Sequence, residues 1–232
     1  MQADKIVTNQ IQLELRQSCE PAFAAFQARL LPTVKAETII GVRTPALRKL
    51  ALELIRQGSA GAFLKVLPHA FFEENQLHAL ILNQSPDSRL ALAEMDRFLP
   101  YLDNWATCDQ LAPRIFKKQP QPLLPFITTW LTSPETYTLR CAVGLLLRFF
   151  LDEHFDPIYL SWVAQIQSAE YYVNRMIAWY FATALAKQYE AAIPYLIERK
   201  LSRRTQLMTI QKAVESRCQS PAVKAYLKAL RY

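Results

Sequence analysis

Glycine is scarce in this sequence, with only 4 residues among 232. Doubly wound α/β enzymes need glycines where the chain turns around a phosphate, and the sequence has neither a GxGxxG nor a GxxxxGK motif. It also lacks sustained alternation of apolar and polar residues and any Asn-Gly hairpin turn. These absences argue against a nucleotide-binding α/β fold and against a β-sheet protein.

Cysteine is equally sparse, and no two cysteines have the CxxC spacing. The four are Cys19, Cys108, Cys141 and Cys218. Such isolated thiols are typical of a reduced cytoplasmic protein and not of a disulfide or zinc framework. Cys108 has no histidine near it in sequence, so we expect a small buried side chain there. We expect a cytoplasmic protein that needs neither a metal nor another cofactor.

Long apolar runs are missing as well. The longest, around residues 142–147, ends at Arg148 and is far shorter than a bilayer span, and the N-terminus has no signal-like segment. Among the few histidines, His78 shares a helix face with Glu74 and has His69 nearby. These three side chains could bind a metal, but we expect a solvated helix face. The sequence thus predicts neither a membrane nor a metal partner.

Apolar residues are abundant, at 51% of the chain, and they recur at the three- and four-residue spacing of amphipathic helices. A proline in the first helical turn lacks only an N–H that would have no partner there, so a capping residue followed by proline predicts a helix start. Five such pairs occur: Thr44-Pro45, Ser85-Pro86, Ser133-Pro134, Asp156-Pro157 and Ser220-Pro221. We predict an all-α fold of about thirteen helices.

The second half contains an internal repeat. Residues 133–140 match residues 168–175 at an offset of 35, with identical Ser, Glu, Tyr and Arg. Such a period in a helical chain indicates stacked helix pairs of the HEAT type, although two unrelated amphipathic helices could match by chance. We predict a single HEAT-like helical-repeat solenoid over residues 1–232, an α-α superhelix of roughly six antiparallel pairs.

The same register aligns Asp109 with Arg140 and Arg175 on successive inner helices, and Asn104 with Glu135. If the two arginines face a concave groove, Asp109 faces it too. A carboxylate among arginines opposes the binding of phosphate. Phosphate binding therefore does not explain a carboxylate at position 109, and we expect Asp109 to have a different role.

Positive charge is concentrated at the C-terminal end. The net charge is +7, and residues 190–232 contain nine Lys or Arg against three Glu. This asymmetry suggests a polyanionic partner such as double-stranded DNA, although a basic surface that only faces solvent has the same composition.

Aromatic and charged residues at helical spacing could form a reactive site. Trp105 and Asp109 are four residues apart and share a helix face, and Trp179 follows Arg175 by four residues in a helix expected over 170–187. Indoles attract cations and stack on bases, and a carboxylate can stabilise a positively charged sugar. The residues alone also allow two core tryptophans and an ordinary ion pair between Asp109 and Arg140.

At this point the sequence resembles the AlkD-type DNA alkylation-repair family. The resemblance spans nearly the whole chain and rests on the order and spacing of GVRTP at 41–45, NWATCD at 104–109, TLRCA at 138–142, RMIAW at 175–179 and the segment 201–217. The family's essential aspartate matches Asp109, its two groove tryptophans match Trp105 and Trp179, and its groove arginine matches Arg140.

The resemblance implies a monomeric, HEAT-like DNA glycosylase that releases cationic purines such as 3-methyladenine and 7-methylguanine from duplex DNA without flipping the base. Two departures stand out. Asn104 replaces a second tryptophan, and residues 180–183 lack a basic residue that the active enzymes have. The alternative is a catalytically inactive module that binds bent or branched DNA, and a protein-binding solenoid is a weaker third interpretation.

In the implied mechanism the cationic purine is already a good leaving group, so no general acid and no lysine nucleophile are required. Asp109 stabilises the oxocarbenium sugar and positions water, while Trp105 and Trp179 contact the deoxyribose and the damaged strand. Arginine side chains hold the phosphates. The residues expected to bind DNA are Arg43, Arg140, Arg175, Arg203 and Arg204.

Overall fold

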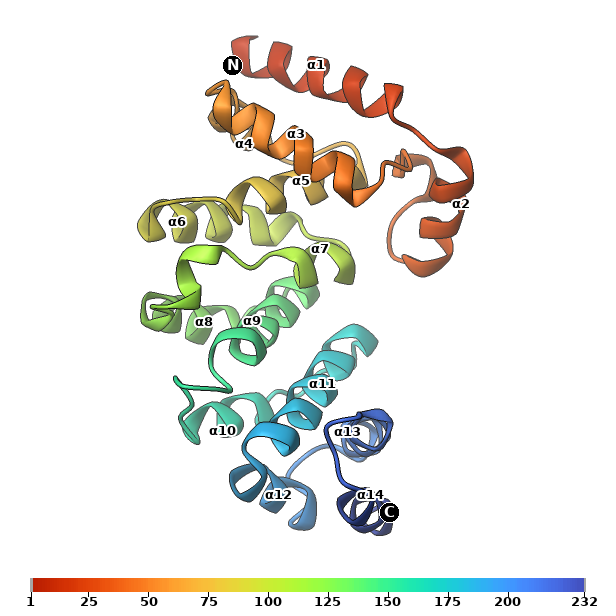
Figure 1. Ribbon diagram of the computed structural model, residues 1–232, viewed down its shortest axis with the longest axis vertical. Helices are drawn as coiled ribbons and strands as arrows, with labels where there is room; N and C mark the ends of the chain where they lie inside the picture. Colours follow the sequence, from red (N-terminus) through yellow and green to blue (C-terminus); the bar gives the residue numbers. More distant parts are fainter. Residues whose placement is uncertain (1, 232) are drawn as a thin grey trace. The chain divides into compact units, whose positions relative to one another are not determined.

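The computed structural model describes residues 2–231. Within this range the chain forms fourteen α-helices and four short 3-10 helices, and it forms no β-strand (Figure 1). The predicted all-α fold is confirmed, with one helix more than expected. The chain divides into two compact units, Met1–Gln119 and Pro120–Tyr232. A single solenoid over both units stays a prediction.

The first unit is built around a core that α1, α3, α4 and α5 share, with the fully buried Phe63 among its members. In this unit α3 packs against α5, α1 packs against α4, and α5 packs against α7. The helices of the first unit are α1 (Gln2–Gln17), α2 (Pro21–Leu30), α3 (Thr44–Arg56), α4 (Ala60–Leu64), α5 (Phe72–Leu82), α6 (Ser88–Phe98) and α7 (Trp105–Gln110).

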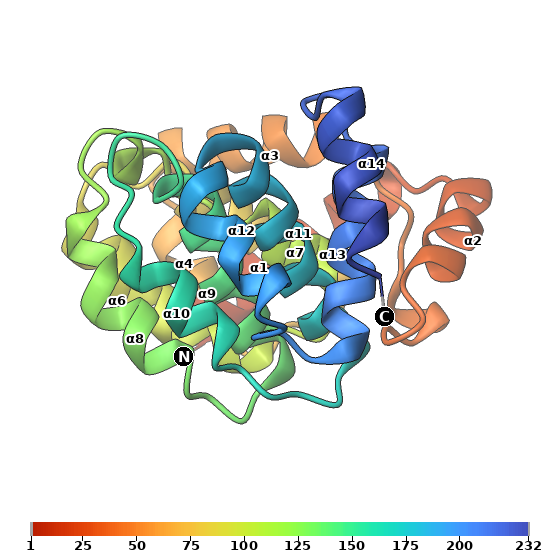
Figure 2. The same ribbon diagram turned by 90° about the horizontal axis from the view of Figure 1, so that it is seen from below.

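In the second unit α11 packs against both α9 and α13, and α14 lies along α13 (Figure 2). The helices of this unit are α8 (Leu124–Trp130), α9 (Thr136–Phe149), α10 (Ile158–Ala164), α11 (Tyr171–Lys187), α12 (Tyr189–Ile197), α13 (Arg203–Glu215) and α14 (Pro221–Ala229). No described helix of either unit is long and apolar enough to cross a lipid bilayer.

The helix starts confirm the predicted register. Asp109, Arg140 and Arg175 are each the fifth residue of their helices, α7, α9 and α11. Asn104 and Glu135 both occupy the N-cap position, as their alignment requires. The shared inner face of these three residues stays a prediction.

The proline pairs predicted helix starts less well. Only Ser220-Pro221 begins its helix as expected, whereas α3 already includes Thr44 and α10 begins two residues after Asp156. The expectations for Ser85-Pro86 and Ser133-Pro134 are wrong, because in both cases an acidic residue nearer the helix takes the N-cap position. The proline then lies in the preceding loop.

Helix α5 departs most from the sequence-based expectation. All of its residues are buried, so the solvated face predicted at Glu74 and His78 is wrong. The Glu74 carboxylate accepts hydrogen bonds from the Gln12 side chain and from two backbone N–H groups, which replace the water that it would otherwise bind. Burial raises the pKa of Glu74, and these hydrogen bonds oppose the rise.

Two imidazoles pair inside the first unit. His69 Nε2 and His78 Nδ1 are 2.9 Å apart. The His69 ring stacks on Phe63 with 4.6 Å between ring centroids, and the His78 ring stacks on Phe98 at 3.8 Å. Among the described residues no group of three or more His, Cys, Asp and Glu side chains is arranged to hold a metal ion.

We expect this histidine pair to make the protein less stable in acid. Burial lowers the pKa of His69 to about 4 and lowers the pKa of His78 well below its usual 6.5, with the charges of His69 and Arg97 adding to the effect on His78. Both rings are therefore neutral in the folded protein and gain protons on unfolding below pH 6.5. The stability that the two neutral rings contribute is fully present above pH 6.5 and is lost as the pH falls. The free energy of unfolding decreases by up to about 1.4 kcal/mol for each pH unit and each histidine.

Urea unfolding at pH 7 and pH 5 measures this dependence. Replacing one ring by His78→Phe should reduce the loss of stability, whereas His154→Phe in the second unit should leave it unchanged. An equal free energy of unfolding for the wild type at both pH values would contradict the prediction.

Candidate nucleic-acid site

The short helix α7 contains two of the predicted site residues, Trp105 and Asp109, one turn apart and both partly exposed. The indole Nε1 of Trp105 donates a hydrogen bond to the backbone carbonyl of Leu30, at the end of α2, over 3.0 Å. The same ring also packs against a small apolar cluster that consists of Leu31, Val34, Ile39 and Phe72. Because Trp105 is packed on one side and partly exposed on the other, its interpretation as a core aromatic is partly correct.

Asn104 is the N-cap residue of α7. Its side chain is fully buried, and Oδ1 accepts hydrogen bonds from the backbone N–H and the hydroxyl of Thr107, at 2.8 and 3.1 Å. Its Nδ2 donates to Asp103 Oδ1 over 2.8 Å. Sequence reasoning aligned Asn104 with Glu135 and noted it as a departure from the family pattern, but it did not assign Asn104 the N-cap role that asparagine favours.

The cysteines match their expected states. Cys108 is buried in α7, with Sγ 3.2 Å from the backbone carbonyl of Asn104, and Cys141 is buried in α9. Cys19 and Cys218 are exposed, and none of the four cysteines, all of which the structure describes, forms a disulfide bond. Cys108 thus fills space beneath the exposed side of α7.

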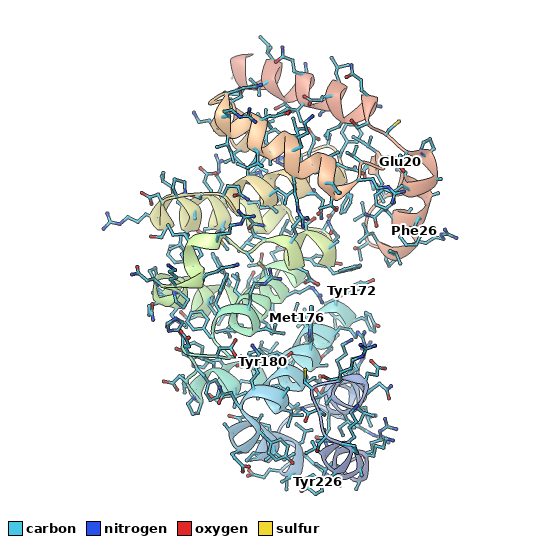
Figure 3. All side chains as sticks on the ribbon, viewed as in Figure 1. Glu20, Phe26, Tyr172, Met176, Tyr180 and Tyr226 are labelled. Atoms are coloured by element: carbon cyan, nitrogen blue, oxygen red, sulfur yellow. The ribbon has the colours of Figure 1, made fainter. Side chains whose placement is uncertain are left out.

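Helix α11 has one buried and one exposed side. Tyr172, Met176 and Tyr180 follow one another along the helix (Figure 3), and both Met176 and Tyr180 are buried. Arg175 and Trp179 lie on the other side, and Trp179 is 40% exposed. The interpretation of Trp179 as a core aromatic is therefore wrong.

The exposed side of α11 continues onto the start of α13. The Tyr171 ring has the Arg175 guanidinium carbon 6.0 Å from its centroid and that of Arg204 at 5.7 Å. Within residues 2–231, neither guanidinium is paired with a carboxylate. We call this group, together with the exposed Arg203 and Trp179, the α11–α13 cluster. Aromatic rings held beside arginines are suited to contact the sugars, bases and phosphates of a nucleic acid.

Arg140 differs from Arg175 despite their equal positions in the repeat. Its side chain is only 5% exposed, and Nη1 donates a 2.6 Å hydrogen bond to the Tyr172 carbonyl at the start of α11. Equal register therefore does not give equal exposure here. The guanidinium of Arg140 ties α9 to α11, a contact that the sequence did not predict.

Arg43 is exposed, but its guanidinium already has an anionic partner. Nε and Nη2 donate to the Glu20 carboxylate at 2.8–3.1 Å, and the guanidinium carbon lies 4.3 Å from the Phe23 ring centroid. This hydrogen-bonded pairing lowers the pKa of Glu20 and raises that of Arg43. A phosphate at Arg43 would have to compete with Glu20.

The beginning of the motif at 41–45 has a structural role, and we call the loop of residues 40–42 the glycine joint. Glu73 of α5 is fully buried, and its carboxylate accepts hydrogen bonds from the backbone N–H groups of Ile40, Gly41 and Val42, at 2.6–3.2 Å. Gly41 has a φ of +91°, and a Cβ there would lie 2.5 Å from the carbonyl oxygen of Glu20. Only glycine fits this close approach. The role of Glu73 was not predicted from the sequence, because its three partners lie 31 to 33 residues away.

The fold and these side chains define an all-helical protein with an exposed group of arginines and aromatics. A family model described as DNA alkylation repair enzyme matches residues 11–216. The chain therefore belongs to the DNA alkylation repair enzyme family, as the sequence resemblance implied. A search among curated proteins finds no match.

Proposed function

We propose that this protein is a monofunctional DNA glycosylase that releases cationic N-alkylated purines, such as 3-methyladenine and 7-methylguanine, from duplex DNA. The observation that supports this most directly is the pair Trp105 and Asp109, partly exposed on one helix of a chain that belongs to the alkylation repair family. An indole beside a carboxylate suits a reaction partner that is positively charged.

The bond that breaks joins deoxyribose C1′ to the purine nitrogen. Both bonding electrons go to the purine, which leaves neutral, and C1′ becomes part of an oxocarbenium cation. The carboxylate of Asp109 stabilises this cation and orients a water molecule. The water oxygen bonds to C1′ and releases a proton to solvent, which completes the hydrolysis.

The α11–α13 cluster is the proposed contact with the DNA backbone. Arg175, Arg203 and Arg204 would pair with phosphates, while Trp179 lies against the damaged strand. The buried Arg140 would act through its hydrogen bond to the Tyr172 carbonyl, which holds the start of α11 in place. Arg43 would act chiefly through its ion pair with Glu20.

Removing one cluster arginine should weaken DNA binding without regard to sequence. For Arg175→Gln or Arg204→Gln we expect a lower affinity and a salt dependence that is less steep by about 0.9 log unit per log unit of salt, because one phosphate contact is lost. Fluorescence anisotropy over a range of salt concentrations measures both quantities. Lys228→Gln on α14 is the matched control, and an unchanged slope for both arginine variants would contradict the proposed contacts.

The direct test is incubation with duplex DNA that contains 7-methylguanine, scored by the release of the free base. Release supports the glycosylase. Salt-dependent binding without release would instead identify a DNA-binding module, and absence of binding at low salt would contradict any role on DNA.

A further inference from the structure

Helix α7 is too short to be stable by itself. It has six residues, whereas isolated helices need about 12–15 residues to be even marginally stable in water. Trp105 and Asp109 nevertheless depend on this helix for their position. Its neighbours must therefore hold it, and α5 packs directly against it.

At the beginning of α7, Gln76 of α5 supports the N-cap. Gln76 Nε2 donates to Thr107 Oγ1 over 2.8 Å, and the Thr107 hydroxyl in turn donates to Asn104 Oδ1 over 3.1 Å. All three side chains are buried. Because the Thr107 oxygen accepts from one partner and donates to the other, the orientation of the cap depends on a donor from α5.

At the end of α7, α5 supplies a second set of contacts. Gln110 Nε2 donates to the backbone carbonyl of Gln76 over 2.9 Å. Asn83, directly after α5, donates from Nδ2 to the Gln110 carbonyl over 2.7 Å and accepts at Oδ1 from the Ala112 N–H, also at 2.7 Å. The side-chain amide of Asn83 thus gives a hydrogen-bond partner to a carbonyl in the last turn of α7 and to an N–H of the loop that follows.

We propose that Gln76 and Asn83 are positioning residues for the reaction, and that they act through α7 on Trp105 and Asp109. Asp109 lies between the two sets of contacts, so loss of either set would let the helix shift or fray. A displacement of about 1 Å can cost two orders of magnitude in rate. This inference rests on the proposed glycosylase function.

Gln76→Met tests it, because methionine has a similar length and lacks the donor. The chain offers a matched control in Gln206→Met. Gln206 is also a fully buried glutamine, and its Nε2 donates to the Leu230 carbonyl in the second unit. Asn83→Leu is the second test variant, and it removes the contacts at the other end of α7.

Three quantities are measured for each variant: the single-turnover rate of 7-methylguanine release, the Kd for duplex DNA, and hydrogen exchange at the α7 amides. For Gln76→Met and Asn83→Leu we expect a rate lower by about tenfold or more, a Kd within about twofold of wild type, and faster exchange in α7. Gln206→Met should leave the rate and the α7 exchange unchanged.

Rates within about twofold of wild type for both α5 variants would overturn the proposal. An equal loss of rate in Gln206→Met would also overturn it, because the effect would then follow general stability. Substitutions of the N-cap residue itself add a further check. Asn104→Ser keeps an oxygen that can accept a hydrogen bond, so it should retain more activity than Asn104→Ala, which has none. If wild type releases no base, the proposed function fails, whereas unchanged α7 exchange in an active protein refutes only the positioning role.

Discussion

Asp109→Asn should reduce the release of 7-methylguanine by about 10²–10³-fold and leave the affinity for duplex DNA unchanged or slightly tighter. The substitution is nearly isosteric and removes only the negative charge. The transition state has positive charge on the sugar, so its stabilisation by Asp109 is lost, by about 3–4 kcal/mol. The phosphates are negative, so ground-state binding loses nothing and can gain. Single-turnover kinetics and anisotropy titrations separate the two effects.

Asp103→Asn is the matched control. Asp103 is exposed just before α7, and asparagine keeps an oxygen that can accept the hydrogen bond from Asn104 Nδ2. We expect nearly full activity from this variant. Full activity in Asp109→Asn would refute the role of the carboxylate, and an inactive wild type that still binds DNA would favour the binding module.

Much of the local arrangement could be predicted because it depends only on helix geometry. Spacing of four residues placed Trp105 with Asp109 on one side of α7, and the structure shows this pair. The same spacing placed Arg175 with Trp179 on α11, where both are exposed. The repeat register predicted where α9 and α11 begin relative to one another.

The remainder depends on contacts between residues distant in sequence. Helix α5 shows no apolar stripe, yet it is buried. Glu73, Glu74 and Gln76 each have a hydrogen-bond partner 31 to 62 residues away, and two nearby backbone N–H groups also donate to Glu74. No local pattern identifies such partners. The contrast between the buried Arg140 and the exposed Arg175 has the same origin, since their helices have different neighbours.

These distant contacts connect the family motif at 41–45 to the site. Glu73 holds the loop that contains Gly41, and three residues later in the same helix Gln76 supports α7. Glu73, which holds this loop, and Gln76, the proposed positioning residue, thus lie on a single buried helix, α5. Loss of the hydrogen bonds between Glu73 and the glycine joint should therefore lower the free energy of unfolding of the unit that contains α7.

Glu73→Gln should lower the free energy of unfolding by about 3 kcal/mol, because buried N–H groups lose charged acceptors. Glu73 Oε1 accepts from Gly41 and Val42, and Oε2 accepts from Ile40. A glutamine offers one oxygen and one NH₂ group, so at least one backbone N–H would face a donor at a fully buried side chain. The hydrogen bonds that remain would also lose the carboxylate charge that strengthens them.

Urea unfolding at pH 7 measures the effect, and Glu37→Gln provides the matched control. Glu37 is exposed in the 3-10 helix Ala36–Thr38, close in sequence to the same loop, so the identical substitution should change stability by less than about 0.5 kcal/mol. Comparable losses in the two variants would show that the three N–H groups do not depend on the charge of Glu73. A large loss in Glu73→Gln alone would establish that the glycine joint is held by a buried carboxylate and not by its backbone conformation alone.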